Sequence, residues 1–201
     1  MKIFSNFISY LLHPLFIPIG GTIAYFLITP KYTPLEIQSA SILPIFILTV
    51  IIPIVTFYIL KNVGLVNSIF LETATERKYP LYIHASILLL ILYKVIPTNY
   101  VSEIYFYFTG LLGATVACLL LLLFNFKTSL HAVGVSGLLM YLINLSIHFE
   151  INLIIAISIF ILLTGAILTA RLYLKAHTRI ELIIGVFIGL LSQLLTVRFW
   201  L

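Results

Sequence analysis

The sequence predicts an all-α protein, a polytopic transmembrane helical bundle with about seven spans. Two observations support this prediction. Only 8% of the 201 residues are charged and 62% are hydrophobic, whereas a soluble domain carries about 25% charged residues. The apolar residues also form runs of about 20 residues, the length that crosses a bilayer core as helix. Because so few charges cannot cover an aqueous surface, we expect a single integral membrane domain, residues 1–201.

The expected spans follow one another with short loops between them. The first is too long for the core of a signal peptide and lacks a small-residue cleavage site, so we expect it to be retained as a helix. His13, Pro14 and Pro18 predict a kink within it. The longest polar segment between spans is 61–80. In chain order, the spans are expected at roughly 5–29, 39–61, 80–97, 103–125, 130–148, 151–170 and 180–199.

The charge pattern argues against several classes of partner. The formal net charge is +5, but the 11 basic residues are scattered over many loops and form no basic stripe, so we expect no nucleic-acid partner. The single cysteine, Cys118, cannot build a disulfide framework or a thiolate metal cluster. Membrane lipids are the expected partners.

Three charged loops are expected on one side of the membrane. Counting the crossings places the loops after the second, fourth and sixth spans on the side of the N-terminus. These loops contain the sequences TATERKYP, FNFKTSLH and ARLYLKAHTRIE. Three charged clusters that meet at one membrane boundary predict a polar pocket there.

The last of these loops carries the most informative spacing. His177 and Glu181 are four residues apart, so in a helix they share a face, and the carboxylate can accept a hydrogen bond from one imidazole nitrogen while the other stays free. His177 is therefore a candidate nucleophile, and Glu181 is its orienting partner. Arg171, six residues before His177, could bind two oxygens of a phosphate through its guanidinium fork.

The other two loops add cations, a hydroxyl group and a second histidine. Ser129 lies where the fifth span should begin and can cap that helix, whose free amide groups favour an anion. Lys127 adds positive charge beside it, and His131 could donate a proton to a leaving oxygen. Arg77 comes shortly before Pro80, which suits the first turn of the third span.

The order and spacing of these residues resemble the signature of a known family, the type 2 phosphatidic acid phosphatase superfamily: K-x6-R-P, then P-S-G-H, then S-R-x5-H-x3-D. The resemblance implies that six spans form a phosphatase core and one is extra. It implies that His177 attacks phosphorus to form a phosphohistidine, that His131 protonates the leaving group, and that Glu181 replaces the orienting Asp. No metal or other cofactor is implied. The residues that would hold the phosphate are Arg77, Ser129 and Arg171.

The match has departures. The first lysine of the signature falls at Phe70, and Pro80 follows Arg77 by three positions rather than one. A dianionic phosphate needs more positive charge than two arginines supply. Lys127 or Lys78, which lies beside Arg77, could provide the missing cation. We expect Lys127 to do so, since it lies on a loop that runs into the start of a helix.

Several of these residues have a simpler interpretation. Lys78, Lys175 and Arg179 are expected to be cations at the lipid boundary. The pair His13-Pro14 is expected to serve helix packing rather than chemistry. Zinc requires three or four ligands, and the neighbouring cations would repel a dication, so we expect no metal site.

Together these features predict a metal-independent lipid phosphatase that acts on a phospholipid or polyprenyl phosphate. Phosphatidate, phosphatidylglycerophosphate and undecaprenyl diphosphate are candidate substrates. The alternatives are a lipid transporter or flippase, which would bind an anionic head group without cleaving it, and a non-catalytic relative that acts as an assembly partner. The excess of basic residues on the motif side points to the cytoplasm. The bacterial members that the chain resembles work mostly on the outer face of the inner membrane, and we expect that location, with a periplasmic site.

Overall fold

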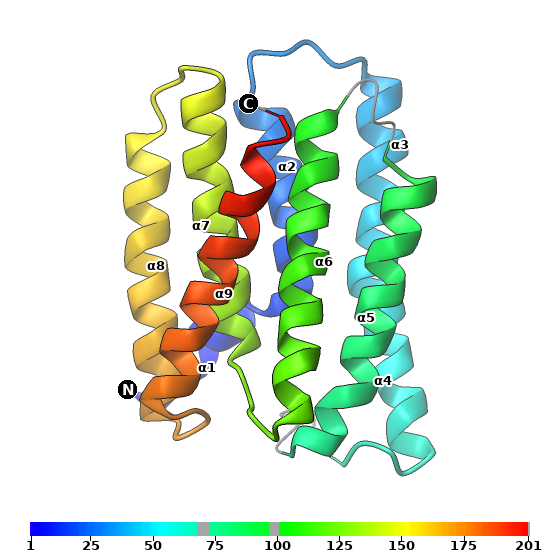
Figure 1. Ribbon diagram of the computed structural model, residues 1–201, viewed down its shortest axis with the longest axis vertical. Helices are drawn as coiled ribbons and strands as arrows, with labels where there is room; N and C mark the ends of the chain where they lie inside the picture. Colours follow the sequence, from blue (N-terminus) through cyan, green and yellow to red (C-terminus); the bar gives the residue numbers. More distant parts are fainter. Residues whose placement is uncertain (68–72, 97–100, 201) are drawn as a thin grey trace.

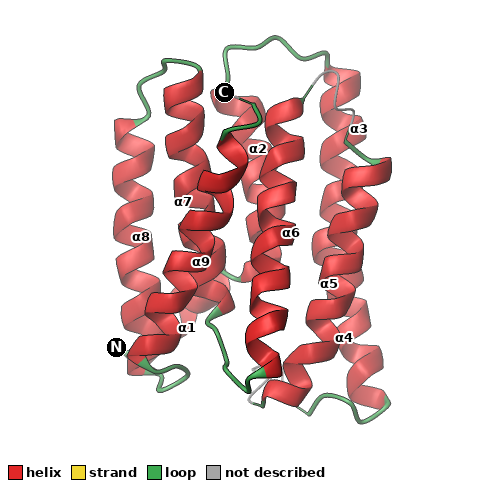
Figure 2. Cartoon of the chain, in the orientation of Figure 1, coloured by secondary structure: helices red, strands yellow, loops and turns green. Residues whose placement is uncertain are grey.

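The computed structural model describes residues 1–67, 73–96 and 101–200, and within these ranges all regular structure is helical (Figures 1 and 2). The helices run side by side along one axis and form a bundle (Figure 1). The elements in chain order are α1 (Lys2–Leu11), η1 (Pro14–Phe16), α2 (Ile17–Ile28), α3 (Leu35–Phe46), η2 (Ile47–Ile51), α4 (Ile52–Asn62), α5 (Ala74–Lys94), α6 (Ser102–Leu123), α7 (Leu130–His148), α8 (Ile154–Tyr173) and α9 (Arg179–Val197).

The described residues contain six helical segments long and apolar enough to cross a membrane: Lys2–Ile28, Leu35–Asn62, Ser102–Leu123, Leu130–His148, Ile154–Tyr173 and Arg179–Val197. The prediction of an integral, all-helical membrane bundle is thus confirmed, but its count of seven spans is not. The missing segment is α5, which runs beside α6 (Figure 1) and packs against it. Charged residues in its first turns, Glu76 to Lys78, and Lys94 at its end make it too polar by composition.

The first span is broken, as the sequence predicts. Helix α1 ends at Leu11, η1 follows with Pro14 as its first residue, and α2 then completes the span. Proline has no amide hydrogen to continue a helix. The outer face of α1 is apolar, with Phe4, Phe7 and Leu11 exposed, while Ser5, Ile8 and Ser9 are buried against the bundle, so the buried face of this helix combines two hydroxyl groups with an apolar side chain.

Four helices end in the same hydrogen-bonded turn. At the end of α8, the amide of Ala176 donates to the carbonyl of Arg171, and the amide of Lys175 donates to that of Leu172, both at 3.0 Å. This pattern requires one residue in the left-handed region, usually glycine. Only α4 uses glycine, Gly64; the other positions with positive φ are Asn125 after α6, Glu150 after α7 and Lys175 after α8.

Among the described helices, α7 and α9 share the most extensive contact, and glycines allow their approach. A Cβ atom on Gly189 would lie 2.1 Å from Oγ of Ser136 and 2.3 Å from the carbonyl oxygen of Val133. A Cβ atom on Gly185 would lie 3.0 Å from the carbonyl oxygen of Ser129. This contact sets the start of α9 beside the start of α7.

The three charged loops lie at one end of the bundle, as the sequence predicts. The described part of the loop after α4, the loop between α6 and α7 and the loop between α8 and α9 occupy the lower end in Figure 1, together with the N-terminus. The loop after α2, the loop between α7 and α8 and the end of α9 lie at the opposite end (Figure 1).

Candidate phosphate-binding site

A cavity of about 390 Å³ lies near the end of the bundle that carries the charged loops. Arg77, His131, Arg171 and His177 line it, so four residues that the sequence singled out meet in one place. His13 lines it as well. Of the described residues that form its wall, none is an aspartate or a glutamate. The cavity therefore offers cations and imidazoles to a ligand without a competing carboxylate in its wall.

The turn between α8 and α9 explains the spacing of Arg171 and His177. The turn at the end of α8 reverses the chain within a few residues, with Lys175 at φ 53°. Helix α9 then begins with a capping box, in which the amide of Glu181 donates to Oγ1 of Thr178 at 3.3 Å and the amide of Thr178 donates to Oε2 of Glu181 at 3.0 Å. The side chains of Arg171 and His177 thus reach the same cavity from opposite ends of a short turn.

His177 and Glu181 form the hydrogen bond that their spacing predicts. Nδ1 of His177 lies 2.8 Å from Oε2 of Glu181. Because a carboxylate accepts hydrogen bonds, Nδ1 carries the hydrogen and Nε2 keeps its lone pair. Burial and then the charge of Arg77 lower the pKa of His177 to about 4, against the raising effect of Glu181. At neutral pH the imidazole is therefore uncharged, the form that a nucleophile requires.

The break in the first span orients His131. In a continuous helix the carbonyl of Ser9 would accept from the amide of His13, but that amide donates to Tyr10 instead, at 3.3 Å. The carbonyl oxygen of Ser9 then lies 3.0 Å from Nε2 of His131. Since a carbonyl only accepts, His131 carries a hydrogen on Nε2, and its Nδ1 is the nitrogen that can exchange a proton.

The two arginines are held differently. Arg77 and Arg171 are both only 6% exposed. Nη1 of Arg77 donates to the carbonyl oxygen of Thr128 at 2.9 Å, which connects the start of α5 to the loop before α7. Nε of Arg171 is buried and has no hydrogen-bond partner among the described residues. A buried donor without a partner is costly, so this one favours an acceptor in the cavity.

Arg77 is placed by a second capping box. The amide of Glu76 donates to Oγ1 of Thr73 at 3.2 Å, and the amide of Thr73 donates to Oε2 of Glu76 at 3.3 Å. The amide of Asn67 donates to Oε1 of Glu76 at 3.0 Å, which ties in the preceding loop. These backbone donors lower the pKa of Glu76. Threonine three residues before glutamate is a capping signal that appears at both helix starts of the site.

Three predicted site residues do not line the cavity. Glu181 acts through its bond to His177. Ser129 is fully buried and caps α7, with the amide of Ala132 donating to its Oγ at 3.4 Å, so the capping prediction is confirmed. Lys127 is half-buried on the loop before α7. Phe70, at the position of the missing lysine, lies outside the described residues.

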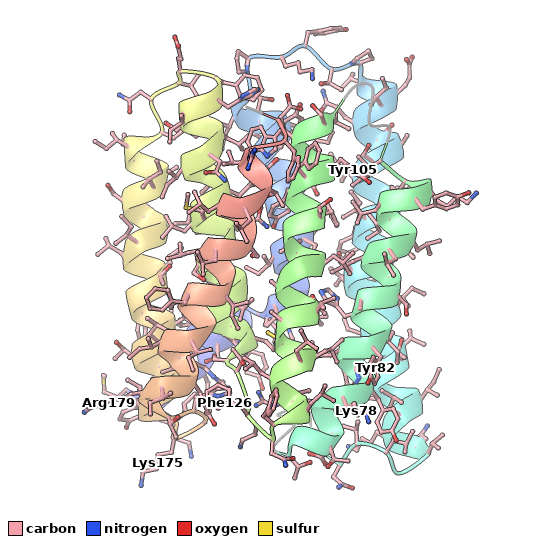
Figure 3. All side chains as sticks on the ribbon, viewed as in Figure 1. Lys78, Tyr82, Tyr105, Phe126, Lys175 and Arg179 are labelled. Atoms are coloured by element: carbon pink, nitrogen blue, oxygen red, sulfur yellow. The ribbon has the colours of Figure 1, made fainter. Side chains whose placement is uncertain are left out.

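The cations expected at the lipid boundary are exposed. Lys175 and Arg179 point away from the bundle at its charged end (Figure 3). Lys78 is also exposed, with Nζ 5.9 Å from the ring centroid of Tyr82. These cations are close to the motif residues in the sequence, but in the structure they do not line the cavity.

One side of the cavity is apolar. Pro53, Ile54 and Phe57 of α4 and Leu81 and Ile83 of α5 form much of this wall. Helix α4 follows η2, a π-helical turn, and Pro53 lies at its second residue. π-Helical turns recur at functional sites. The cavity wall thus combines cationic side chains with apolar side chains of the second span and α5.

A second polar cluster, which the sequence did not indicate, lies at the opposite end of the bundle. Glu103 is 4% exposed and accepts a hydrogen bond from Oη of Tyr25 at 2.9 Å. Its other oxygen lies 3.4 Å from Nζ of Lys31 and 3.7 Å from Nε2 of His148. The cluster connects the loop after α2 to the start of α6 and the end of α7. No regular spacing links these residues, so no motif could have found it.

The site brings together an uncharged imidazole with a free nitrogen, a second imidazole and two buried guanidinium groups. Nucleophile, proton donor and anion-binding cations are the groups required to transfer a phosphoryl group. Among the described residues, no three His, Cys, Asp or Glu side chains are grouped to hold a metal ion. Comparisons of the chain with family models, with curated proteins and with solved structures give no match.

Proposed function

We propose that the protein is a membrane lipid phosphatase, which hydrolyses a lipid phosphate monoester or a polyprenyl diphosphate through a phosphohistidine intermediate. The observation that carries this proposal is the cavity shared by Arg77, Arg171 and His177. Two buried arginines without a carboxylate in the described wall favour an anion, and the bond from His177 to Glu181 leaves the other ring nitrogen free on a residue that lines the same cavity.

In the proposed first step, Nε2 of His177 attacks phosphorus. An N–P bond forms as the P–O bond to the leaving group breaks, and Glu181 stabilises the positive charge that develops on the ring. The guanidinium groups of Arg77 and Arg171 bind the equatorial oxygens, where the charge is spread.

His131 handles the proton of the leaving group. A bound dianion offsets the charge of the arginines and favours protonation of Nδ1, since Nε2 is engaged by Ser9. The leaving oxygen takes the proton from Nδ1. In the second step a water attacks phosphorus, gives its proton to Nδ1 of His131, and the N–P bond breaks to release inorganic phosphate and free His177.

The apolar wall of the cavity, formed by side chains of α4 and α5, supports a lipid as substrate. A phosphate head group would contact the arginines while a hydrocarbon tail packs against α4 and α5. The charged part of the lipid would then lie among cations and the apolar part among apolar side chains. The bacterial inner membrane and a periplasmic site remain part of the proposal, and phosphatidate, phosphatidylglycerophosphate and undecaprenyl diphosphate are the first lipids to offer.

The test is release of inorganic phosphate from these three lipids by purified protein in lipid nanodiscs, with trapping of the phosphoenzyme from ³²P-labelled substrate. His177→Ala is expected to abolish both signals, and Glu181→Gln to reduce turnover less. His131→Ala should slow turnover least when the leaving group is acidic, as phosphate is. Arg179→Ala is the control, since Arg179 is exposed and points away (Figure 3).

The alternatives give different results when a transport assay in proteoliposomes is added. A flippase would move labelled lipid across the proteoliposome membrane without releasing phosphate, and a non-catalytic assembly partner would do neither. Phosphate release that survives His177→Ala at a near-normal rate would remove His177 as the nucleophile.

A further inference from the structure

His13 lies in the same cavity as the residues above, although its sequence suggested only a packing role. It belongs to the break of the first span, and its ring is in edge-to-face contact with that of His131, with centroids 5.4 Å apart and planes at 82°. Both rings line the cavity. His13 thus lies beside the group that handles the proton, on a span that carries no residue of the three motifs.

The protonation of the His13 ring follows from its capping role. The amide of Leu15 donates to Nδ1 of His13 at 3.3 Å, which caps η1. An atom that accepts a hydrogen bond from an amide keeps its lone pair, so the neutral ring carries its hydrogen on Nε2. Nε2 of His13 has no hydrogen-bond partner among the residues that the structure describes. The ring therefore presents a fixed N–H donor.

Two donors in this cavity are thus without partners in the described chain: Nε of Arg171 and Nε2 of His13. The corresponding hydrogen of His131 differs, because it is engaged by the carbonyl of Ser9. A buried donor such as Nε of Arg171 is normally satisfied, and the described cavity wall offers no carboxylate to either donor. A multi-oxygen anion would satisfy both at once.

We infer that His13 is an anion-binding residue of this site, which donates from Nε2 to a phosphoryl oxygen. The inference deepens the proposed function and rests on it for the identity of the anion. A neutral donor adds to the binding of a phosphate without placing a further buried positive charge beside Arg77 and Arg171. It also supplies part of the anion binding that the missing lysine of the first motif would have given.

Three substitutions separate binding from capping. Serine, asparagine and aspartate all cap a helix start, so each can replace the bond from Leu15 and preserve the break. His13→Ser leaves no donor that reaches the anion, His13→Asn keeps an N–H donor, and His13→Asp presents a negative charge. A purely structural role predicts three similar proteins, whereas an anion-binding role predicts three different affinities.

The measurement is the affinity of the intact protein in nanodiscs for inorganic phosphate, determined from ³¹P NMR line broadening. The KM and kcat for a lipid phosphate are measured on the same variants. His13→Ser should weaken phosphate binding about tenfold, a change of about 1.4 kcal/mol, and should raise KM. His13→Asn should stay within about threefold of wild type, and His13→Asp should bind most weakly. Arg179→Ser, which removes an exposed cation at the same end, should bind phosphate as wild type does.

The outcomes distinguish this inference from the proposed function. Equal phosphate affinity in wild type and His13→Ser, or no binding of phosphate by wild type, overturns the inference. Absence of hydrolysis with phosphate binding that still depends on His13 overturns the proposed function and leaves His13 as an anion ligand. Loss of affinity in all three variants to the same extent would assign His13 to capping alone and also overturns the inference.

Discussion

Arg77 and Thr128 are 51 residues apart in the sequence and are joined by a hydrogen bond of 2.9 Å from Nη1 to the carbonyl oxygen. Thr128 directly precedes Ser129, the capping residue of α7. One guanidinium group therefore both lines the cavity and fixes the loop that leads into the helix of His131. The cavity wall and the start of α7 thus share one side chain.

Arg77→Lys is expected to weaken both the binding of an anion in the cavity and the bond that fixes the loop before α7. Lysine keeps the charge but not the planar fork that can bind a carbonyl and an anion together. We expect phosphate release to fall about 10- to 150-fold, as for the loss of a charge-assisted hydrogen bond of about 1.5–3 kcal/mol, and the melting temperature in detergent to fall as well. Unchanged melting together with unchanged turnover would show that the bond to Thr128 has no energetic role.

Arg171→Leu is expected to separate stability from activity. Nε of Arg171 is buried without a partner in the described chain, and replacing a buried charge by an apolar side chain can stabilise a protein. In the absence of phosphate, the melting temperature should stay the same or rise, while turnover and phosphate affinity are lost. A marked fall in melting temperature would mean that Arg171 is a structural residue.

The protonation of His177 gives a prediction for pH. Burial, and next Arg77, lower its pKa to about 4 from the ordinary 6.5. Between these values the unfolded chain binds more protons than the folded one, so stability should fall as the pH drops from about 6.5 to about 4 and should not depend on this group above 6.5. NMR titration of ring-labelled histidine, assigned with His177→Asn, should find the midpoint near 4. A midpoint near 6.5 would contradict the buried, neutral nucleophile.

Gly189→Ala tests the packing that brings α9 to α7. The new methyl group would overlap Oγ of Ser136 and the carbonyl of Val133, and such overpacking costs about 1–3 kcal/mol. We expect a lower melting temperature and lower turnover, because α9 carries Glu181. Gly165→Ala in α8 is the matched control, since apart from its chain neighbours and the nearby backbone of its own helix no described atom lies within 4 Å of the position of its Cβ; it should be neutral or slightly stabilising.

Lys127→Ala and Lys78→Ala compare the two cations that could replace the lysine of the first motif. Lys127 is half-buried on the loop before α7, where its charge adds to the positive potential at the helix start; its loss should lower phosphate release about tenfold, or 1.4 kcal/mol. Lys78 is exposed beside Tyr82, and its loss should matter little. Equal losses in parallel kinetics would indicate a diffuse electrostatic effect.

Much of the site could be predicted from the sequence because its chemistry lies in short, local spacings. The bond between His177 and Glu181 depends on a separation of four residues within one helix start. The broken first span depends on a proline, and the common side of the charged loops depends only on counting spans. The first two features depend on a few neighbouring residues, and the third depends on how often the chain crosses the bilayer.

The remainder depends on contacts between distant segments. The carbonyl of Ser9 is a backbone group with no signal of its own, so its bond to His131 could not be predicted. His13 caps η1 and lines the cavity, which the sequence did not indicate, and its expected role in helix packing stays a prediction. The sequence predicts a third span that begins at about residue 80, whereas α5 begins at Ala74 and holds Arg77 and its charged neighbours in its first turns.

The hydrogen bond between Ser9 and His131 also bears on biosynthesis. The site needs a carbonyl from the first span and a carboxylate from the start of the last, so it cannot be complete until almost the entire chain has left the ribosome and entered the bilayer. A partly translated chain would hold arginines and His131 near the membrane surface without a positioned nucleophile. Under the proposed function, newly made protein is therefore inert towards the phosphates of the membrane that receives it until its final helix is inserted.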